Sequence, residues 1–247
     1  MPNTAIVNKP YVNIDGLKIS RPSVSAIGVE AGRARNSTNV NDIVISEALV
    51  LNCLVNGANG LDAGALANNL MYNVYVIGDS NNLEAPAGIV SLASNAQPDL
   101  PFGYDMWRRI GAVRTDGSAE FLVFDQTGDG KERTMWYRTA FATDVAGAGA
   151  SATFAAVDLS SSVPSTAQVL VAKCAFTPTA ANDPLELRSG NSTTDSGQAI
   201  SSGAVGGVVE ECNLVCPIGD AVATGVYYKV TGGSVAISVQ GYVDVLS

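Results

Sequence analysis

The 247-residue sequence predicts an all-β protein with two antiparallel β-sandwich or jelly-roll-like domains and an extended N-terminal arm. Charged residues make up 15% of the chain, against about 25% in an average protein, while Ala, Val, Gly, Ser, Thr and Asn are abundant. Short apolar runs alternate with turn pairs containing Gly, Asn and Asp, and no long amphipathic helical pattern interrupts them. This length fits one large β domain or two of ordinary size, and we favour two.

The first part of the chain predicts an arm followed by two strands. Residues 1–22 are polar and contain three prolines, so we expect an arm or an edge strand that docks on a neighbouring molecule. Strands are predicted at residues 23–29 and 42–55, where apolar residues alternate with polar ones. Residues 31–39 have the composition of a loop between them.

The middle of the chain predicts a loop, a buried strand and a meander. Residues 56–69 are rich in Gly, Asn and Ala and suggest a loop, with a short helix at 63–70. Residues 72–77 are apolar on both faces, as is typical of a strand at the centre of a sandwich. Residues 108–141 predict a three-stranded meander, because Asp116-Gly117 can adopt the positive φ angles of a tight hairpin turn.

A second β domain is expected after residue 145. Residues 142–150 consist mainly of Ala and Gly and suggest a linker. The predicted domains are thus a β domain at 23–145, containing the meander, and a C-terminal β-sandwich at 146–247. Strands of the second domain are expected at 152–159, 168–176, 184–188, 205–215, 222–230 and 234–246. Gly232-Gly233 is interpreted as the hairpin turn between the last two.

The charge balance and the absence of histidine narrow the functional classes. Fourteen Lys and Arg against 23 Asp and Glu give a net charge of −9, which disfavours nucleic acid as a partner. Without histidine, the commonest general base and metal-binding nitrogen are missing. No apolar run is long enough to span a membrane, and the first ten residues lack the basic and apolar regions of a signal peptide. We therefore expect synthesis in a cytoplasm and no membrane partner.

The four cysteines, Cys53, Cys174, Cys212 and Cys216, are predicted to be buried, reduced thiols on apolar strand faces. A zinc site would need all four of them, since no histidine can complete a tetrahedron. Only Cys212 and Cys216 are close in sequence. A disulfide formed after release from the cell and a metal site stay open as alternatives.

Carboxylates provide two weak candidates for chemistry. Residues 125–130 place acids beside a glycine turn, but they lack the alternating oxygens and distal glutamate of an EF-hand, so we predict a plain turn. Glu210 and Glu211 are neighbours in a predicted strand and would point to opposite faces, which favours a solvated edge over an acid-base pair. Serine-nucleophile and phosphate-loop motifs are absent. We predict no catalytic, cofactor-binding or metal-binding residue; a carboxylate-pair hydrolase is the enzymatic alternative.

Aromatic and arginine side chains provide candidates for binding. The aromatic residues that could stack on a sugar ring are Tyr104, Trp107, Trp136, Tyr137, Tyr227 and Tyr228. Packing in a core or an interface is the alternative role for them. Arg108, Arg109 and Arg114 could bind an anion, but we expect them to pair with nearby acids. The acids expected to do so are Asp105, Asp116 and Glu120.

Two stretches between about residues 59 and 124 carry a resemblance. Residues 60–64 read Gly-Leu-Asp-Ala-Gly and precede Tyr-Asn-Val-Tyr-Val-Ile at 72–77. Residues 100–104 read Leu-Pro-Phe-Gly-Tyr and precede Arg-Arg-Ile-Gly at 108–111 and the Asp116-Gly117 turn. Both ordered motifs resemble those of bacteriophage structural proteins from tail fibres and virion appendages.

The resemblance implies a non-enzymatic structural component of a bacteriophage virion: a tail fibre, tail-tip, collar or other external appendage. It implies a homotrimer or another homo-oligomer, contacts with other virion proteins through the N-terminal arm, and a location in the virion after synthesis in the host cytoplasm. Collagen-like, heptad and shaft repeats are absent. A capsid decoration or head-fibre protein is therefore one alternative. The other is a receptor- or glycan-binding module for host attachment, contacting the host through C-terminal loops or Trp107 and Trp136.

Overall fold

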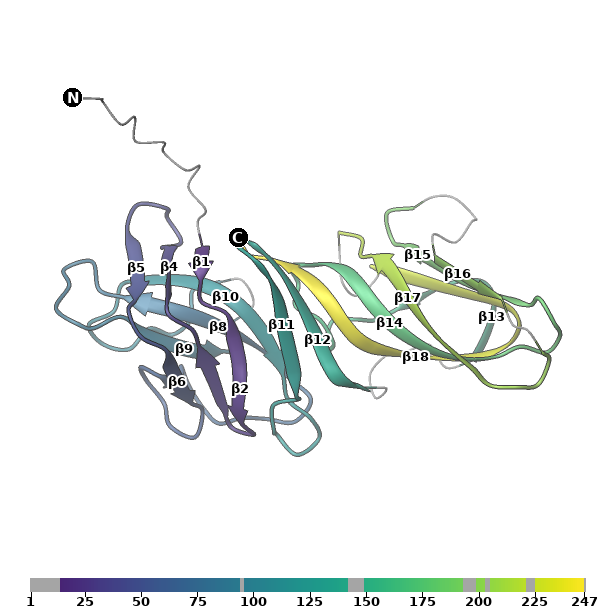
Figure 1. The fold of residues 1–247 in the computed structure, drawn as a ribbon, viewed down its shortest axis with the longest axis horizontal. Coiled ribbons are helices and arrows are strands. Elements are labelled where there is room, and N and C mark those ends of the chain that lie inside the picture. The colour runs from purple at the N-terminus through teal and green to yellow at the C-terminus, as the bar shows by residue number, and fades with distance from the viewer. Residues whose placement is uncertain are drawn as a thin grey trace, which may run out of the picture.

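A computed structural model describes residues 14–93, 96–141, 149–192, 199–202, 205–220 and 225–246. Every regular element within these ranges is a β-strand, which confirms the all-β class. Four sheets are present in the described part of the chain, and Figure 1 shows them as two groups along the long axis. Three small sheets form the N-terminal group, and one large curled sheet forms the C-terminal group.

Two of the small sheets are three-stranded and antiparallel. One contains β1 (Ile14–Gly16), β4 (Gly32–Arg35) and β5 (Asp42–Ile45), and the other contains β2 (Ile19–Ser23), β3 (Ala26–Val29) and β6 (Leu49–Asn52). β1 and β2 are edge strands, which agrees with the edge strand that was one of the two alternatives expected for residues 1–22. The other alternative, an extended arm, is wrong for residues 14–22, because Ile14, Leu17 and Ile19 are buried in the core. Residues 1–13 of the predicted arm lie outside the described residues.

The strands after β2 differ from the predictions in two places. The predicted loop at 31–39 contains β4, whose residue Ala34 is buried between β1 and β5. The predicted strand at 42–55 is divided into β5 and β6, which belong to different sheets. β4, β5 and β6 are each four residues long and bury only one or two side chains. Strands this short show too little alternation of apolar and polar residues to be recognised in the sequence.

The third small sheet has the order β10 (Met106–Arg114), β8 (Met71–Gly78), β9 (Ala87–Ser91), β7 (Gly60–Leu61). β8 is buried on both faces, as predicted for 72–77. The expected short helix at 63–70 is wrong. The backbone there bonds instead to side chains of β8 and of the residue that follows β10: the Ala67 N–H donates to the Tyr72 hydroxyl at 2.8 Å, and the Thr115 hydroxyl donates to the Ala67 carbonyl at 2.6 Å.

The predicted meander at 108–141 is wrong, because its strands belong to two sheets. β10 pairs with β8, whereas β11 (Phe124–Asp129) and β12 (Glu132–Phe141) pair with each other in the large sheet. A turn does form at Asp116-Gly117, but the positive φ angles predicted for this pair are wrong, because the residue with a positive φ is Ala119, at 61°. The turn closes only an isolated bridge from Thr115 to Phe121. Beyond the turn, the Phe121 N–H donates to the carbonyl of Val24 at 2.8 Å, so the chain leaves β10 for another partner.

The large sheet is organised around one long strand. Its strands are β11, β12, β13 (Gly149–Val157), β14 (Ala167–Thr177), β15 (Pro184–Ser189), β16 (Ala199–Ser202), β17 (Glu210–Pro217) and β18 (Val226–Val245). β12 and β13 pair with one edge of β18, and β14 and β15 pair with the other. β17 continues the sheet beyond β14, and β16 continues it beyond β15. The predicted boundary near residue 145 therefore falls between two strands that share one edge of β18.

β18 passes through the predicted hairpin turn at Gly232-Gly233. That hairpin is wrong, because the two halves of β18 hydrogen-bond to flanking strands and do not pair with each other. Gly233 adopts φ +99°, and the pairing of β13 with β18 shifts register beside it. Figure 1 shows that β18 is strongly curved and that the large sheet curls over on itself. Glycine lets the strand bend without ending it.

One apolar core and a buried ion pair join the two groups of sheets. A single cluster of buried side chains includes residues from all four sheets, from Ile14 to Leu246. Across it, Arg109 on β10 pairs with Asp244 on β18, with Nη2 2.7 Å from Oδ2, and both side chains are at most 2% exposed. Asn73 accepts a further bond from Arg109 at 2.7 Å, and Thr166 donates to Asp244 at 2.5 Å.

The remaining members of the predicted arginine group are also structural. Arg108 donates to the carbonyl of Asn36 at 3.4 Å, and Arg114 donates to the carbonyl of Ser161 at 2.9 Å. Both are buried, and burial lowers the pKa of each guanidinium. The expected pairing with Asp105, Asp116 and Glu120 is wrong: Asp105 accepts from Ser80, and Asp116 accepts from backbone N–H groups of its own turn.

Asp79 organises the loop after β8, and its charge gives a pH-dependent prediction. Its carboxylate accepts bonds from the backbone N–H groups of Asn81 at 2.9 Å and Leu83 at 2.7 Å, which lower the pKa of Asp79 below its usual 3.8. A lowered pKa means that the carboxylate stabilises the fold fully above 3.8 and loses this effect as the pH falls below it. Asp79→Asn should therefore lower the melting temperature at neutral pH, and the difference from wild type should shrink in acid. Thermal denaturation of both proteins across this range tests it; a difference independent of pH would contradict it.

Candidate functional site

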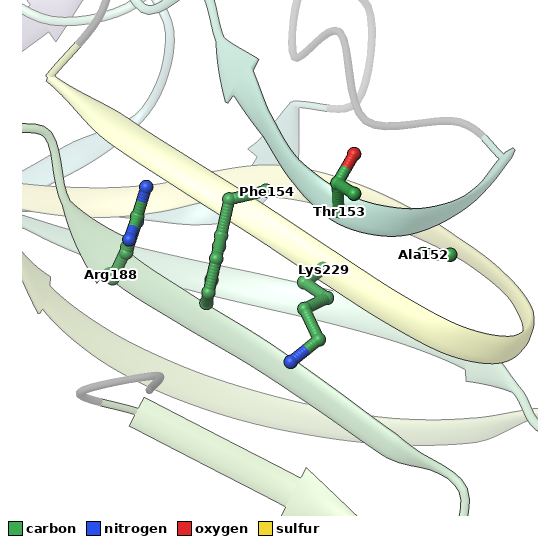
Figure 2. A pocket seen from close by; sticks show the side chains of 5 residues that line it. All are labelled: Ala152, Thr153, Phe154, Arg188 and Lys229. Atoms are coloured by element: carbon green, nitrogen blue, oxygen red, sulfur yellow. The ribbon is translucent and has the colours of Figure 1, made fainter. Parts of the chain in front are cut away.

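A pocket of about 450 Å³ opens on the C-terminal sheet where β13, β15 and β18 meet (Figure 2). Ala152, Thr153 and Phe154 of β13 line it together with Arg188 of β15 and Lys229 of β18. Its volume lies within the range of roughly 300–1,000 Å³ that is usual for small-molecule sites. Three strands far apart in sequence thus supply one site.

Phe154 lies between two cationic side chains. The Arg188 Cζ is 4.1 Å from the centroid of the Phe154 ring, and the Lys229 Nζ is 5.3 Å from it. Figure 2 shows the ring between these two side chains. The Arg188 Cζ also lies 5.5 Å from the ring centroid of Tyr227. Cations prefer the electron-rich faces of aromatic rings, so these contacts hold both cationic groups at the pocket.

Strand register places the charges on one face. Glu186 pairs with Lys229, and Arg188 pairs with Tyr227, in the ladder between β15 and β18. Residues two apart on a strand share a face, so these four side chains lie together. The Lys229 Nζ is 2.8 Å from the Glu186 Oε1, which fixes the ammonium group at the edge of the site. Among the residues that the structure describes, this face therefore brings together Arg188, Lys229 and the carboxylate of Glu186.

This grouping of charges contrasts with the surrounding sequence. Residues 142–247 contain nine Asp and Glu but only three Lys and Arg, namely Lys173, Arg188 and Lys229. Two of these three cations line the pocket, and the third pairs with Glu211 at 3.0 Å. Positive charge is thus concentrated at one place in an acidic region.

The aromatic candidates from the sequence are not brought together. Tyr137 is buried against Tyr242, with ring centroids 6.2 Å apart, and Trp107 packs against Tyr75 at 5.8 Å. Tyr228 is buried and Tyr104 packs on an apolar cluster, so packing is the role of these side chains. Trp136 is 40% exposed and lies on β12, and Tyr227 contacts Arg188, which lines the pocket.

Phe154 was missed by sequence reasoning, as were Arg188 and Lys229 as a pair. Phe154 stands in an alanine-rich stretch that resembles any half-buried strand. The scarcity of Lys and Arg after residue 142 was the one available signal, because a rare cation in an acidic segment invites a search for its role.

The acidic candidates occupy ordinary strand positions. The turn predicted for residues 125–130 is wrong for 125–129, which belong to β11; the turn lies at 130–131. Asp125 pairs with Arg138 on β12 at 3.0 Å. Glu210 and Glu211 lie at the start of β17, at the edge of the sheet, with Glu211 exposed, as expected for a solvated edge. In the described part of the chain, no three His, Cys, Asp or Glu side chains are grouped so as to hold a metal ion.

All four cysteines are free thiols in the structure. The predicted burial is confirmed for Cys53, Cys174 and Cys216 and is wrong for Cys212, which is only partly buried. Burial raises the pKa of Cys53, Cys174 and Cys216 to about 12. Cys174 lies directly opposite Cys212 in the ladder between β14 and β17.

Alkylation should therefore distinguish one thiol from the other three. With iodoacetamide at mildly alkaline pH, we expect Cys212 of the native protein to react first, because thiolate is the reactive form and the buried thiols form very little of it. Cys53, Cys174 and Cys216 should react at a similar rate only after unfolding in guanidinium chloride. Peptide mass spectrometry of timed samples measures this order. Equal labelling of all four cysteines in the native protein would contradict it.

No family model, curated protein or solved structure matches this chain. Among the residues that the structure describes, there is no helix with the length and apolar character needed to cross a membrane.

Proposed function

We propose that this chain is a non-enzymatic structural component of a bacteriophage virion, acting in a tail fibre, tail-tip, collar or other external appendage through homo-oligomeric assembly and attachment. The resemblance between residues 59 and 124 supports this proposal. The resembling segments 60–64, 72–77 and 108–111 contribute to β7, β8 and β10, which are strands of a single sheet. Motifs far apart in sequence thus contribute to one structural unit.

The observation that carries the proposal is a surface patch of apolar side chains at the end of β6. Val50, Leu54 and Val55 are 61%, 74% and 52% exposed, and β6 is an edge strand. Next to them, a pocket of about 440 Å³ is lined partly by Val24 and Leu66. Leu54 itself lines this pocket, and exposed apolar side chains beside a sheet edge are typical of surfaces that a partner chain covers.

The oligomeric state of the purified chain tests this proposal. Mass photometry should find a homotrimer or another closed homo-oligomer, and Leu54→Asp should shift it towards monomer, because a buried unpaired carboxylate destabilises an interface. Leu83→Asp changes a leucine outside the patch that is 84% exposed, more than Leu54, and should have no effect. A wild-type monomer at micromolar concentration would contradict the proposal.

The position of the chain in the particle is tested separately by electron microscopy. Density for this fold on a tail, collar or other appendage would agree with the proposal. Density on the capsid surface would instead favour a decoration or head-fibre protein. Host attachment through a glycan is the second candidate, and the cationic pocket around Phe154 is the observation that favours it.

A further inference from the structure

We propose that the pocket lined by Phe154, Arg188 and Lys229 binds the carboxylate of an acidic sugar, such as a uronic acid residue of a surface polysaccharide. This inference deepens the attachment role proposed above and rests on it.

The two cationic groups are held in place before any ligand arrives. Arg188 is fixed against the Phe154 ring, and Lys229 is fixed by the ring and by Glu186. Ordering long flexible side chains on binding costs affinity, so a site whose cations are already ordered avoids much of that cost. The guanidinium is planar and matches the two oxygens of a carboxylate.

The Phe154 ring adds a second attraction for an anion. Because both cations lie over its faces, a ligand between them meets the ring edge. The edge of an aromatic ring carries the positive part of its quadrupole. Ala152 and the phenyl edge also provide an apolar wall on which the C–H groups of a sugar ring can rest. A carboxylate attached to a ring therefore fits the lining better than a bare ion does.

The charge of the rest of the molecule selects against highly charged ligands. The net charge is −9, and residues 142–247 carry nine acids against three cations. A nucleic acid or a polyphosphate would bring one or more charges per unit close to this acidic surface and be repelled. A polysaccharide with single, spaced carboxylates places one charge at the pocket and neutral rings around it.

The test measures binding of methyl glucuronide and of an alternating glucuronate oligosaccharide to the full-length protein by titration calorimetry or ligand-observed NMR. Methyl glucoside, acetate and inorganic phosphate are the comparison ligands. We expect a dissociation constant on the order of 1 mM for the monosaccharide, tighter binding of the oligosaccharide, and weaker binding at high salt. No detectable binding of methyl glucoside is expected, because it lacks the carboxylate.

The variants Arg188→Gln and Lys229→Gln should each weaken binding of the oligosaccharide by about tenfold or more. Arg138→Gln removes an exposed cation on β12 and should leave binding unchanged. Thermal denaturation verifies that each variant is folded, and a variant that fails to fold leaves the other, together with the comparison ligands, as the test.

Three results would overturn the inference: no binding of either glucuronate ligand, equal binding of the neutral sugar, or equal binding of acetate or phosphate. The last would reassign the pocket to small anions. If the wild-type protein is oligomeric but binds neither glucuronate ligand, this inference alone is refuted. If the wild-type protein is monomeric but binds glucuronate, only the proposed homo-oligomeric assembly is refuted.

We also infer, from an independent observation, that Cys174 and Cys212 form a disulfide when the protein enters an oxidising environment. They face each other in the antiparallel ladder between β14 and β17. Opposite residues in such a ladder have Cα atoms about 4.5–5.5 Å apart, within the 4.4–6.8 Å range of disulfides. Burial is the main cause of the raised pKa of the Cys174 thiol, and interaction with the Cys212 side chain is the second. The two thiols are therefore close enough to interact.

A low-molecular-weight disulfide, oxidised glutathione, is the oxidant in this reaction. The Cys212 thiolate attacks it, forms a mixed disulfide and releases one glutathione thiolate. The Cys174 sulfur, losing its proton, then attacks the Cys212 sulfur and releases the second glutathione. Two protein thiols thereby lose two protons and two electrons, and one glutathione disulfide becomes two thiols.

Intact-mass and peptide analysis of the full chain after incubation with oxidised glutathione tests this inference. We expect the loss of two hydrogen atoms and a crosslinked peptide pair containing Cys174 and Cys212. Cys212→Ser should abolish the crosslink, whereas Cys216→Ser should leave it intact. A link between Cys212 and Cys216, a mixed disulfide that does not resolve, or no oxidation would each overturn the inference.

Discussion

Arg109→Met is expected to lower the free energy of unfolding by about 3–5 kcal/mol, because it leaves the buried carboxylate of Asp244 without its cation. Both side chains are at most 2% exposed, so water cannot replace the lost partner. Asn73 would also lose the bond that it accepts from Arg109. Urea unfolding followed by tryptophan fluorescence measures this effect, since Trp107 lies two residues from the substitution on the same strand.

Two further variants separate the ion pair from general damage. Arg138→Met breaks the pair with Asp125, whose two side chains are mostly exposed, and should cause no measurable loss. The double variant Arg109→Met with Asp244→Leu removes both buried charges and should recover much of the stability lost in the single variant. A loss in Arg109→Met no larger than that in Arg138→Met would contradict the role given to the buried pair.

The fold class and many strands could be predicted because their signal is local. β8 and β14 alternate or accumulate apolar residues over their own length, and the predicted ranges 72–77 and 168–176 agree with them to within one residue at each end. The pairing of strands cannot be predicted in the same way, because it depends on which distant segment packs against the side chains of each strand. The pairing of β10 with β8 has no local signal, and the Asp116-Gly117 turn suggested the wrong neighbour.

The candidate site shows the same limit more strongly. Phe154, Arg188 and Lys229 come from three strands, and only the register of β15 and β13 with β18 brings them to one pocket. The arginine group at 108–114 was recognised, but its partners were sought among nearby acids, whereas Asp244 lies 135 residues from Arg109. Charge partners across a core are chosen by tertiary packing, which single-sequence patterns do not encode.

Gly233→Ala is the second substitution with a large expected effect, a loss of about 2–4 kcal/mol. Two costs add at this position. Gly233 adopts φ +99°, a conformation that residues with a Cβ rarely take, and an added Cβ would lie 2.0 Å from the carbonyl oxygen of Thr177. Backbone atoms must move to relieve that contact, and they belong to β14, which pairs with the same part of β18.

Gly57→Ala separates these two costs. Gly57 has a similar φ of +106°, but nothing lies within 4 Å of an added Cβ, so only the conformational cost of about 1–2 kcal/mol applies. Thermal and urea unfolding of both variants should therefore show a clearly larger loss for Gly233→Ala. Because this glycine lies where β18 bends, its substitution should also disturb the packing of one half of the curled sheet on the other, visible as faster amide exchange in β14 and β15 than in β8. Equal losses in the two variants would mean that the close approach of Thr177 does not constrain the bend.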